Sequence, residues 1–207
     1  MSDADVIHPD GDPGAFDTLV LGIGNVLYAD EGFGVRAVEA LNARYTFPDS
    51  VRVMDGGTQG IFLLPWVCSA KRLLILDAVD FGMQPATLRV VRGDDVPCFM
   101  GAKKVSMHQA GFQEVLASAD LTGSLPAELA LVGVQPELLD DYGGSLTDGV
   151  RARIGDAVEA ACEVLRGWGI TPVPREEPLS GSDVIGPTAL DIHDYERGRP
   201  VIEGGSA

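Results

Sequence analysis

Short runs of consecutive apolar residues recur along the chain, without the polar alternation of a half-exposed strand. Such runs, rich in β-branched residues, are typical of strands buried on both faces of a parallel sheet. We therefore predict buried strands at Thr18–Leu21, Leu73–Leu76 and Leu129–Val134, and a further strand at Val51–Met54. The segment Thr87–Val91 alternates more strongly, so we expect an edge strand there and leave its direction open between parallel and antiparallel.

Apolar residues at helical spacing separate these strands. After the first strand, Val35 and Val38 begin an apolar stripe, which predicts a helix that packs on the sheet. Asp30 is placed to cap this helix, and Glu31 falls in its first turn. A long amphipathic helix is expected at Leu146–Trp168. The alternation predicts a three-layer α/β/α fold of phosphorylase/hydrolase-like type, with a mostly parallel open sheet of about five strands and helices on both faces.

The two ends of the chain differ from this pattern. Residues 1–17 and 175–207 are rich in Asp, Glu, Pro and Gly and have no hydrophobic periodicity. We expect a flexible acidic leader and a flexible acidic tail on either side of one domain, 18–174.

The formal net charge of −16 limits the classes of molecule that the protein can bind. Repulsion of this size opposes binding to nucleic acid and to anionic membranes. No apolar run is as long as the roughly 20 residues of a bilayer-spanning helix, and the acidic N-terminus is unlike a secretory signal. We therefore expect a cytoplasmic protein. Cys68, Cys98 and Cys162 are widely separated, which supports neither a disulfide framework nor a zinc knuckle.

A glycine turn follows the first predicted strand. Gly22-x-Gly24 resembles the start of a dinucleotide-binding motif, in which backbone amides receive a pyrophosphate. Leu27 stands where the third glycine of that motif should be. Asp30 and Glu31 also bring two negative charges to the turn, and they would repel a phosphate. The turn is better suited to a cation.

Three ligand-type residues are expected at one edge of the sheet. Glu31 follows the first strand, and Asp77 directly follows the apolar run Leu73–Leu76. His108 lies in the first turn of a helix whose start, Ser106-x-x-Gln109, has the form of a capping box. The carboxyl ends of parallel strands open on one crevice, where two carboxylates and an imidazole suit a borderline divalent ion. From these residues alone, a metal site and an ordinary polar crevice are equally supported.

Several motifs, in this order and spacing, resemble those of the hydrogenase maturation endopeptidases. The first is Gly22-Ile23-Gly24-Asn25-Val26-Leu27, followed by Asp30-Glu31-Gly32-x-Gly34-Val35. The others are Asp55-Gly56-Gly57-Thr58, Leu76-Asp77-Ala78, Ser106-x-His108-Gln109 and Gly133-Val134-Gln135-Pro136-Glu137. The resemblance covers roughly Leu19 to Pro174.

This resemblance implies a protease that removes a C-terminal peptide from the large-subunit precursor of a nickel-iron hydrogenase after nickel insertion. It carries the metal-binding residues of the family onto Glu31, Asp77 and His108. Nickel would be brought by the precursor, and another divalent ion could occupy the site in the isolated protein. We expect the enzyme to act as a monomer and to be classed with the aspartyl proteases.

Two alternatives remain open, one for the role of Asp55 and one for the overall function. Asp55 is a candidate general base or substrate-positioning carboxylate, and it is equally well explained as a residue of the turn at Gly56 and Gly57. Instead of cutting the precursor, the protein could be a nickel-sensing binding module. A dinucleotide-dependent enzyme is less favoured, because of Leu27 and the acidic turn.

Overall fold

A five-stranded sheet forms the centre of the molecule. The computed structural model describes residues 15–102, 107–180 and 183–186 together with Ile192 and Tyr195, and of residues 101–102 and 107–110 the backbone alone. The strand order is β3-β1-β4-β6-β5. The strands are β1 Thr18–Ile23, β3 Val51–Gly57, β4 Arg72–Ala78, β5 Leu88–Arg92 and β6 Glu128–Val134. β1 pairs in parallel with β3 and β4, β4 pairs in parallel with β6, and β5 is an antiparallel edge strand against β6. The three buried strands, the strand at Val51–Met54 and the edge strand predicted from the sequence are all present. β3, which contains Val51–Met54, is half-buried and forms the other edge of the sheet.

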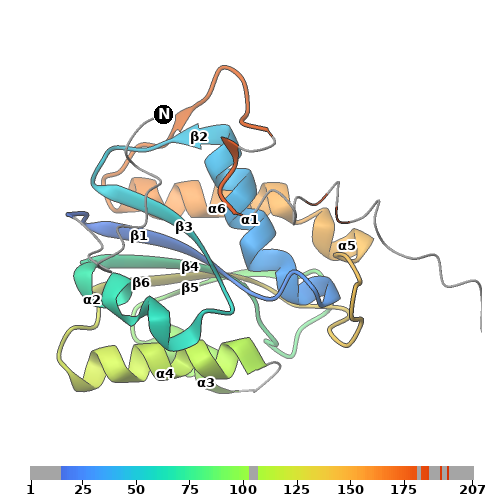
Figure 1. Ribbon diagram of the computed structural model, residues 1–207, viewed down its shortest axis with the longest axis horizontal. Coiled ribbons are helices and arrows are strands. Elements are labelled where there is room, and N and C mark those ends of the chain that lie inside the picture. Colours follow the sequence, from blue (N-terminus) through green and yellow to red (C-terminus); the bar gives the residue numbers. More distant parts are fainter. Residues whose placement is uncertain (1–14, 103–106, 181–182, 187–191, 193–194, 196–207) are drawn as a thin grey trace, which may run out of the picture.

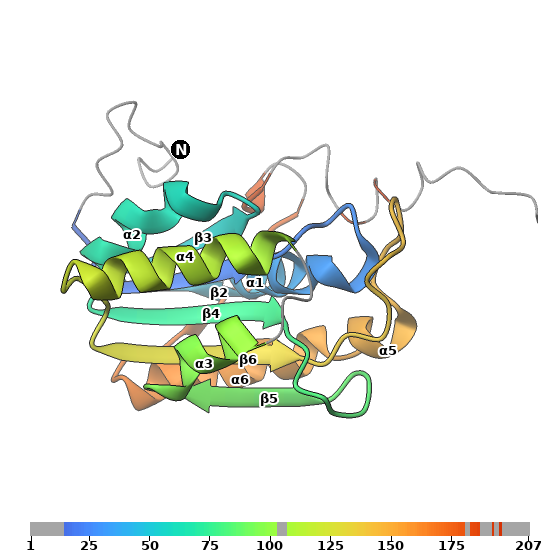
Figure 2. The ribbon, with the colours of Figure 1, turned by 90° about the horizontal axis from the view of Figure 1, so that it is seen from below.

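Helices cover both faces of this sheet, as Figures 1 and 2 show. One face carries α1 (Phe33–Arg44) and α6 (Ile154–Gly167), which contact each other and the sheet. The other carries α2 (Leu64–Ser69), α3 (Asp95–Ala102) and α4 (Met107–Leu121). Short 3-10 helices precede two of them, η2 at Ala29–Gly32 and η3 at Gly60–Leu63. The predicted three-layer α/β/α fold is therefore confirmed.

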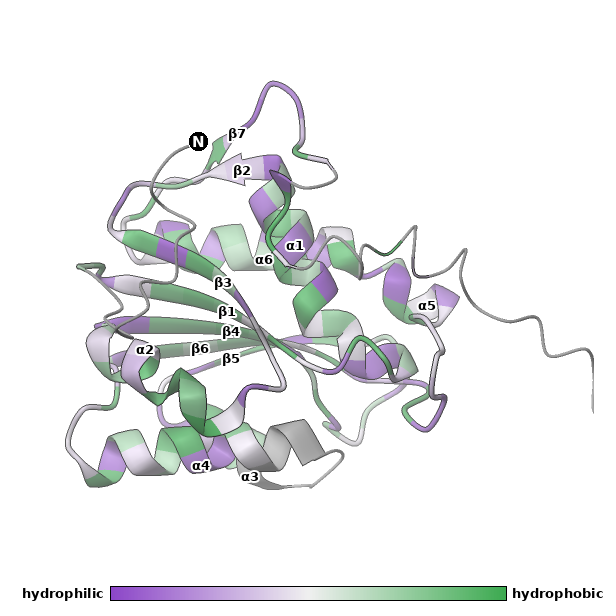
Figure 3. Ribbon diagram, in the orientation of Figure 1, coloured by the Kyte–Doolittle hydropathy of each residue, from purple (hydrophilic) through white to green (hydrophobic). Residues whose placement is uncertain are grey.

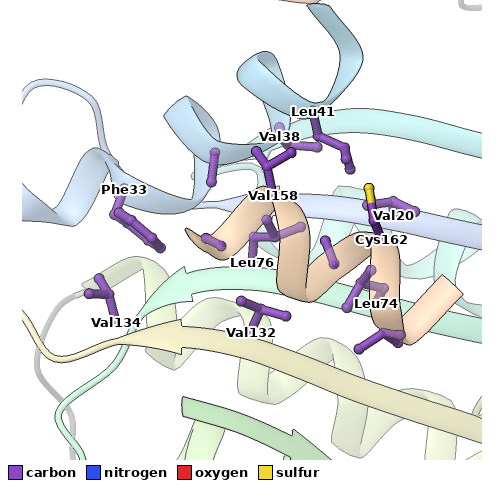
Figure 4. Close-up of a cluster of buried hydrophobic side chains, with 14 of the residues drawn as sticks. Val20, Phe33, Val38, Leu41, Leu74, Leu76, Val132, Val134, Val158 and Cys162 are labelled. Atoms are coloured by element: carbon purple, nitrogen blue, oxygen red, sulfur yellow. The ribbon is translucent and has the colours of Figure 1, made fainter. Parts of the chain in front are cut away.

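Two hydrophobic cores lie on the two faces of the sheet. Figure 4 shows the first, in which Val20, Leu74 and Val132 of the strands meet Val38 of α1 and Val158 of α6. The second lies between the other faces of the same strands and α2, α3 and α4. The central strands are buried along nearly their whole length and are coloured as hydrophobic in Figure 3. This explains why their sequences read as unbroken apolar runs.

The predicted long helix Leu146–Trp168 is wrong as a single element. The chain instead forms a short α5, Asp148–Arg151, and then α6, which begins at Ile154. Thr147 caps α5 by accepting a hydrogen bond from the Val150 amide. The same residue is also bonded to Asp30, so α5 is fixed to the loop after β1 while α6 follows the sheet. The amphipathic pattern continues across the break and does not reveal it.

The chain beyond α6 turns back along α1. β7 (Val173–Pro174) pairs with β2 (Tyr45–Thr46), which directly follows α1. The Arg175 amide donates to the Arg44 carbonyl oxygen at 2.8 Å, and the Leu179 amide donates to the Ala43 carbonyl oxygen at 2.9 Å. The flexibility expected for 1–17 and 175–207 stays a prediction. In the described part of the chain, no helix is long and apolar enough to cross a membrane.

Candidate functional site

The polar residues singled out in the sequence gather at one edge of the sheet. The carboxyl ends of β1, β3, β4 and β6 point to this edge, because these four strands run in the same direction. In Figures 1 and 2 the start of α4 lies at the same edge. The edge therefore brings together η2, the end of β4 and the first turn of α4, which carry Glu31, Asp77 and His108.

The glycine turn after β1 is shaped by close backbone packing. The Gly24 amide donates to the Gly57 carbonyl oxygen at 3.1 Å, and the Asn25 amide donates to the Glu31 carbonyl oxygen at 3.1 Å. Gly24 has a φ of +146°, and a Cβ there would collide with the Glu31 carbonyl oxygen. Glycine is needed because η2 folds back directly on the turn. The chain itself fills the space at the turn that a pyrophosphate would need, which disfavours the dinucleotide alternative.

Asp30 binds a distant loop, and the prediction that it caps the first helix is wrong. Neither η2 nor α1 has a side-chain cap. The Asp30 carboxylate is fully buried and accepts hydrogen bonds from the amides of Glu137 and Leu138, both at 2.9 Å to Oδ2. Its Oδ1 accepts from the Thr147 amide at 2.7 Å, and the Thr147 hydroxyl donates to Oδ2 at 3.2 Å. Asp30 thus joins η2 to the loop between β6 and α5.

The two predicted carboxylate ligands are both buried. Asp77 is 0% exposed at the end of β4, and its Oδ1 accepts a hydrogen bond from the Ala78 amide at 2.8 Å. Glu31 is 9% exposed within η2, which contacts β4. A buried negative charge is costly unless a positive charge or hydrogen-bond donors compensate it. Burial therefore brings two oxygen-donor side chains to one edge of the sheet.

His108 is the second residue of α4, so its backbone lies at this edge. Its side chain and the predicted cap Ser106 lie outside the described residues. Among the residues described with side chains, no group of three or more His, Cys, Asp and Glu residues is placed to hold a metal ion. The predicted metal site therefore stays a prediction.

Asp55 and Asp77 point to opposite faces of the sheet. Asp55 is paired with Gly22 in the parallel ladder, and a Cβ on Gly22 would meet Val38 of α1. Asp77 is paired with Gly133, where a Cβ would meet Phe81 in the core on the α4 side. β1 also lies between β3 and β4, which separates the two backbones by about 9–10 Å.

Asp55 lies in a small charged cluster on the α1 side. Arg36 of α1 is only 5% exposed and donates from Nη1 to the Glu39 carboxylate at 3.0 Å. Oδ1 of Asp55 is buried and has no hydrogen-bond partner of good geometry in the described part of the chain. Burial raises the pKa of Asp55, while the Gly57 backbone and the positive charge of Arg36 partly offset this effect. The carboxyl group is therefore more easily protonated than an ordinary aspartate.

Gln135 lies at this edge, and no role was predicted for it from the sequence. Its Oε1 accepts from the amides of Phe81 and Met83, at 2.8 and 3.1 Å, and its Nε2 donates to Asp80 at 3.1 Å. Gln135 thereby holds the loop that follows Asp77. An open cleft of about 370 Å³ lies beside it, lined by Asp80 and residues 135–140. The position of Gln135 directly after an apolar strand is the one sequence signal that could have indicated its role in holding this loop.

Comparison with known proteins identifies the family. Residues 35–164 match the family model described as hydrogenase maturation protease. The chain belongs to this family.

Curated relatives and solved structures agree. A hydrogenase expression/formation protein HoxM of Azotobacter vinelandii is 54% identical over 185 residues, 89% of this chain and 88% of the relative. The hydrogenase 2 maturation protease of Escherichia coli is 44% identical over 159 residues, 76% of this chain and 96% of the relative. The structure of the hydrogenase maturating endopeptidase HybD from E. coli superposes with a TM-score of 0.73 at 42% identity, and the match covers 77% of this chain and 98% of that one.

The expected classification with the aspartyl proteases is wrong. The matching family and the similar structures are hydrogenase maturation proteases, which are not aspartyl proteases. The geometry agrees with this correction. An aspartyl dyad needs two carboxylates that share a proton about 3 Å apart, whereas Asp55 and Asp77 lie on separate strands and face opposite sides of the sheet. The hydrogenase maturation protease fold therefore cannot form a dyad from these two residues.

Proposed function

We propose that the protein removes the C-terminal extension from the large-subunit precursor of a nickel-iron hydrogenase after nickel insertion. The observation that carries this proposal is the membership in the hydrogenase maturation protease family across residues 35–164. The buried carboxylates of Glu31 and Asp77 at the sheet edge support it, because they give a cation-friendly surface at the place where open parallel sheets bind ligands. The cytoplasmic location and the monomeric state stay predictions.

Glu31, Asp77 and His108 are the proposed contacts to the nickel ion that the precursor carries. Two carboxylates and an imidazole are oxygen and nitrogen donors, which suit a borderline divalent ion and leave positions for the ligands of the precursor. Nickel in the precursor is a positive charge close to the bond to be cut. The enzyme residues bind this ion and so fix the scissile peptide in the crevice, which is worth several orders of magnitude in rate.

Asp55 is the proposed general base or substrate-positioning carboxylate. Its raised pKa brings the carboxyl group nearer to the range in which proton transfer is efficient. Oδ1 is buried and accepts no hydrogen bond of good geometry within the described residues, so a water or a peptide N–H that reached it would gain a favourable hydrogen bond. Arg36, buried close by, keeps part of the ionised form available.

The test is the mass of the precursor before and after incubation with the protein. We expect the nickel-loaded precursor to lose its C-terminal extension and the metal-free precursor to stay intact. Equal cleavage of both forms would contradict recognition through nickel. Binding of the nickel-loaded form without any loss of mass would instead support the nickel-sensing binding module.

Single substitutions sharpen this test. Asp77→Asn and Glu31→Gln keep the shape of the side chain but remove a charged ligand, and His108→Ala removes the imidazole. We expect each to slow cleavage by about 100-fold or more, because the misplaced ion no longer aligns the peptide. Glu163→Gln, at an exposed position on α6, is the matched control and should cut at the normal rate. A normal rate for any of the first three variants would remove that residue from the proposed site.

A further inference from the structure

The C-terminal part of the chain reaches the charged cluster around Asp55. The cover segment, defined as residues 175–180 and 183–186, begins at the end of α1, where Arg175 Nε donates to the Asn42 carbonyl oxygen at 3.1 Å. Further along, Ile185 packs against the core under α1 and α6. In Figure 1 the cover segment, red in the colour scale, runs beside α1.

Gly186 is the point at which the cover segment meets the cluster. A Cβ on Gly186 would lie 3.2 Å from Glu39 Oε1 and 3.5 Å from Asp55 Oδ2. Its φ of +102° also favours glycine. Gly186 therefore lies next to both carboxylates, and a side chain there would crowd Glu39 and touch Asp55.

The contact covers Asp55 but provides no well-formed hydrogen bond to its Oδ1. Oδ1 is buried and accepts no well-formed hydrogen bond in the described part of the chain. Leaving a buried acceptor without a donor costs free energy, so a peptide that presented an N–H to this oxygen would bind here with an advantage over the chain's own segment. The cover is thus the kind of contact that a better-matched peptide can replace.

The cover segment is also shared unequally among relatives. Residues 1–174 make up 84% of the 207 residues, so the HoxM relative, which matches 89% of the chain, includes part of 175–207. The hydrogenase 2 maturation protease of E. coli is 96% covered by 159 aligned residues, about the length of 18–174 alone. The family fold therefore does not require the cover segment.

We propose that the surface of α1 and β3 around Asp55 is a docking surface for the C-terminal extension of the precursor, and that the cover segment occupies it in the free protein. This inference rests on the proposed function for the identity of the competing peptide. The precursor must displace the cover segment before Asp55 can act, and the cost of displacement reduces the apparent affinity for the precursor.

The test compares the full chain, a chain ending at Ser180, and the full-length variant Gly186→Val. Carboxyl NMR of Asp55 is the first measurement and needs no substrate. Because burial is the main cause of its raised pKa, removal of residues 181–207 should lower the pKa of Asp55, and Gly186→Val should lower it as well. Gly123→Val is the matched control, since Gly123 also has a positive φ but no atom within 4 Å of an added Cβ. An unchanged Asp55 titration in both altered chains would show that the segment does not cover Asp55 and would overturn the inference.

The second measurement is cleavage of the nickel-loaded precursor. We expect KM to fall about five-fold in the shortened chain and in Gly186→Val, with kcat unchanged, because the part of the cover segment at residues 183–186 no longer occupies the surface. An unchanged or higher KM overturns the competition, and a higher KM would show that the segment binds the precursor itself. If no form of the protein cuts the precursor, the proposed function fails while the NMR result still decides whether the segment covers Asp55.

Discussion

Asp30, in η2 after β1, and Asp55, within the neighbouring strand β3, are two aspartates whose surroundings are opposite. The Asp30 carboxylate is fully buried and accepts four hydrogen bonds from Glu137, Leu138 and Thr147. The Asp55 carboxylate is partly buried, and its Oδ1 accepts none of good geometry within the described residues. The first carboxylate is fully hydrogen-bonded by the protein, whereas the second is only partly compensated, by the Gly57 backbone and the charge of Arg36.

This difference separates a structural carboxylate from a candidate functional one. Hydrogen bonds to a charged acceptor are worth about 1.5–3 kcal/mol each, so Asp30 contributes to holding two loops together. A buried acceptor without a donor lowers stability and needs another explanation, such as a catalytic role. The three predictions below test this contrast, from the largest expected change in stability to the smallest.

Removal of the compensated carboxylate should have the largest effect. Asp30→Ala leaves three partly buried backbone amides without their charged acceptor, so we expect the free energy of unfolding to fall by about 3 kcal/mol. Urea denaturation measures it. Asp120→Ala, at an exposed position on α4, is the control and should stay within about 0.5 kcal/mol of the wild type. If the two variants were equally stable, the structural role of Asp30 would be wrong.

An intermediate effect is expected at Thr147. Thr147→Val removes the hydroxyl bond to Asp30 and the cap on the Val150 amide, but it keeps the backbone bond to Asp30 Oδ1. The loss should be about 1 kcal/mol. In a double-mutant cycle with Asp30→Ala, the two losses should add up to more than the double variant shows, because both act on one network. Strict additivity would speak against a shared network.

The smallest change in stability is expected for Asp55→Asn. This substitution should stabilise the protein, whereas the two substitutions above destabilise it. A raised pKa means that the native protein binds more protons than the unfolded chain between the unfolded pKa of about 3.9 and the native pKa. The contribution of Asp55 to stability therefore falls as pH rises through this window. Asp55→Asn lacks this decline, so its stability relative to the wild type should be at least as high at pH 7 as at pH 5.

Urea denaturation at several pH values from 5 to 7.5 measures this effect, since the sequence pI of 4.3 makes lower values unsuitable. Cleavage by Asp55→Asn should fall at the same time, because the carboxylate is lost. A variant that is both less stable at pH 7 and fully active would reverse the contrast between Asp30 and Asp55.

Local sequence patterns were enough to predict the sheet. The runs Thr18–Leu21 and Leu73–Leu76 are apolar because both faces of β1 and β4 are covered, so burial is visible in each run by itself. The alternation in Thr87–Val91 likewise reflected the exposed side of β5. The break between α5 and α6 was missed, because the hydrophobic stripe does not record where Thr147 is held.

The site was harder to predict because its contacts are distant in sequence. Asp30 was read as a local helix cap, but its partners Glu137 and Thr147 are 107 and 117 residues further along the chain. The placement of Asp55 and Asp77 on opposite faces follows from strand register, which spacing alone does not give. The order of the family motifs did locate the sheet edge where Glu31 and Asp77 lie.

The bond between Asp30 and Thr147 also sets the order in which the molecule can be completed. During synthesis the N-terminal part of a chain leaves the ribosome first, at about 5–20 residues per second. η2, which carries Glu31, receives its full set of hydrogen bonds from the distant loop only after residue 147 has emerged. Closing so long a loop is slow compared with forming local structure. We therefore expect a nascent chain that ends before Thr147 to lack the finished edge of the sheet, so that competence to bind the precursor is acquired late in synthesis.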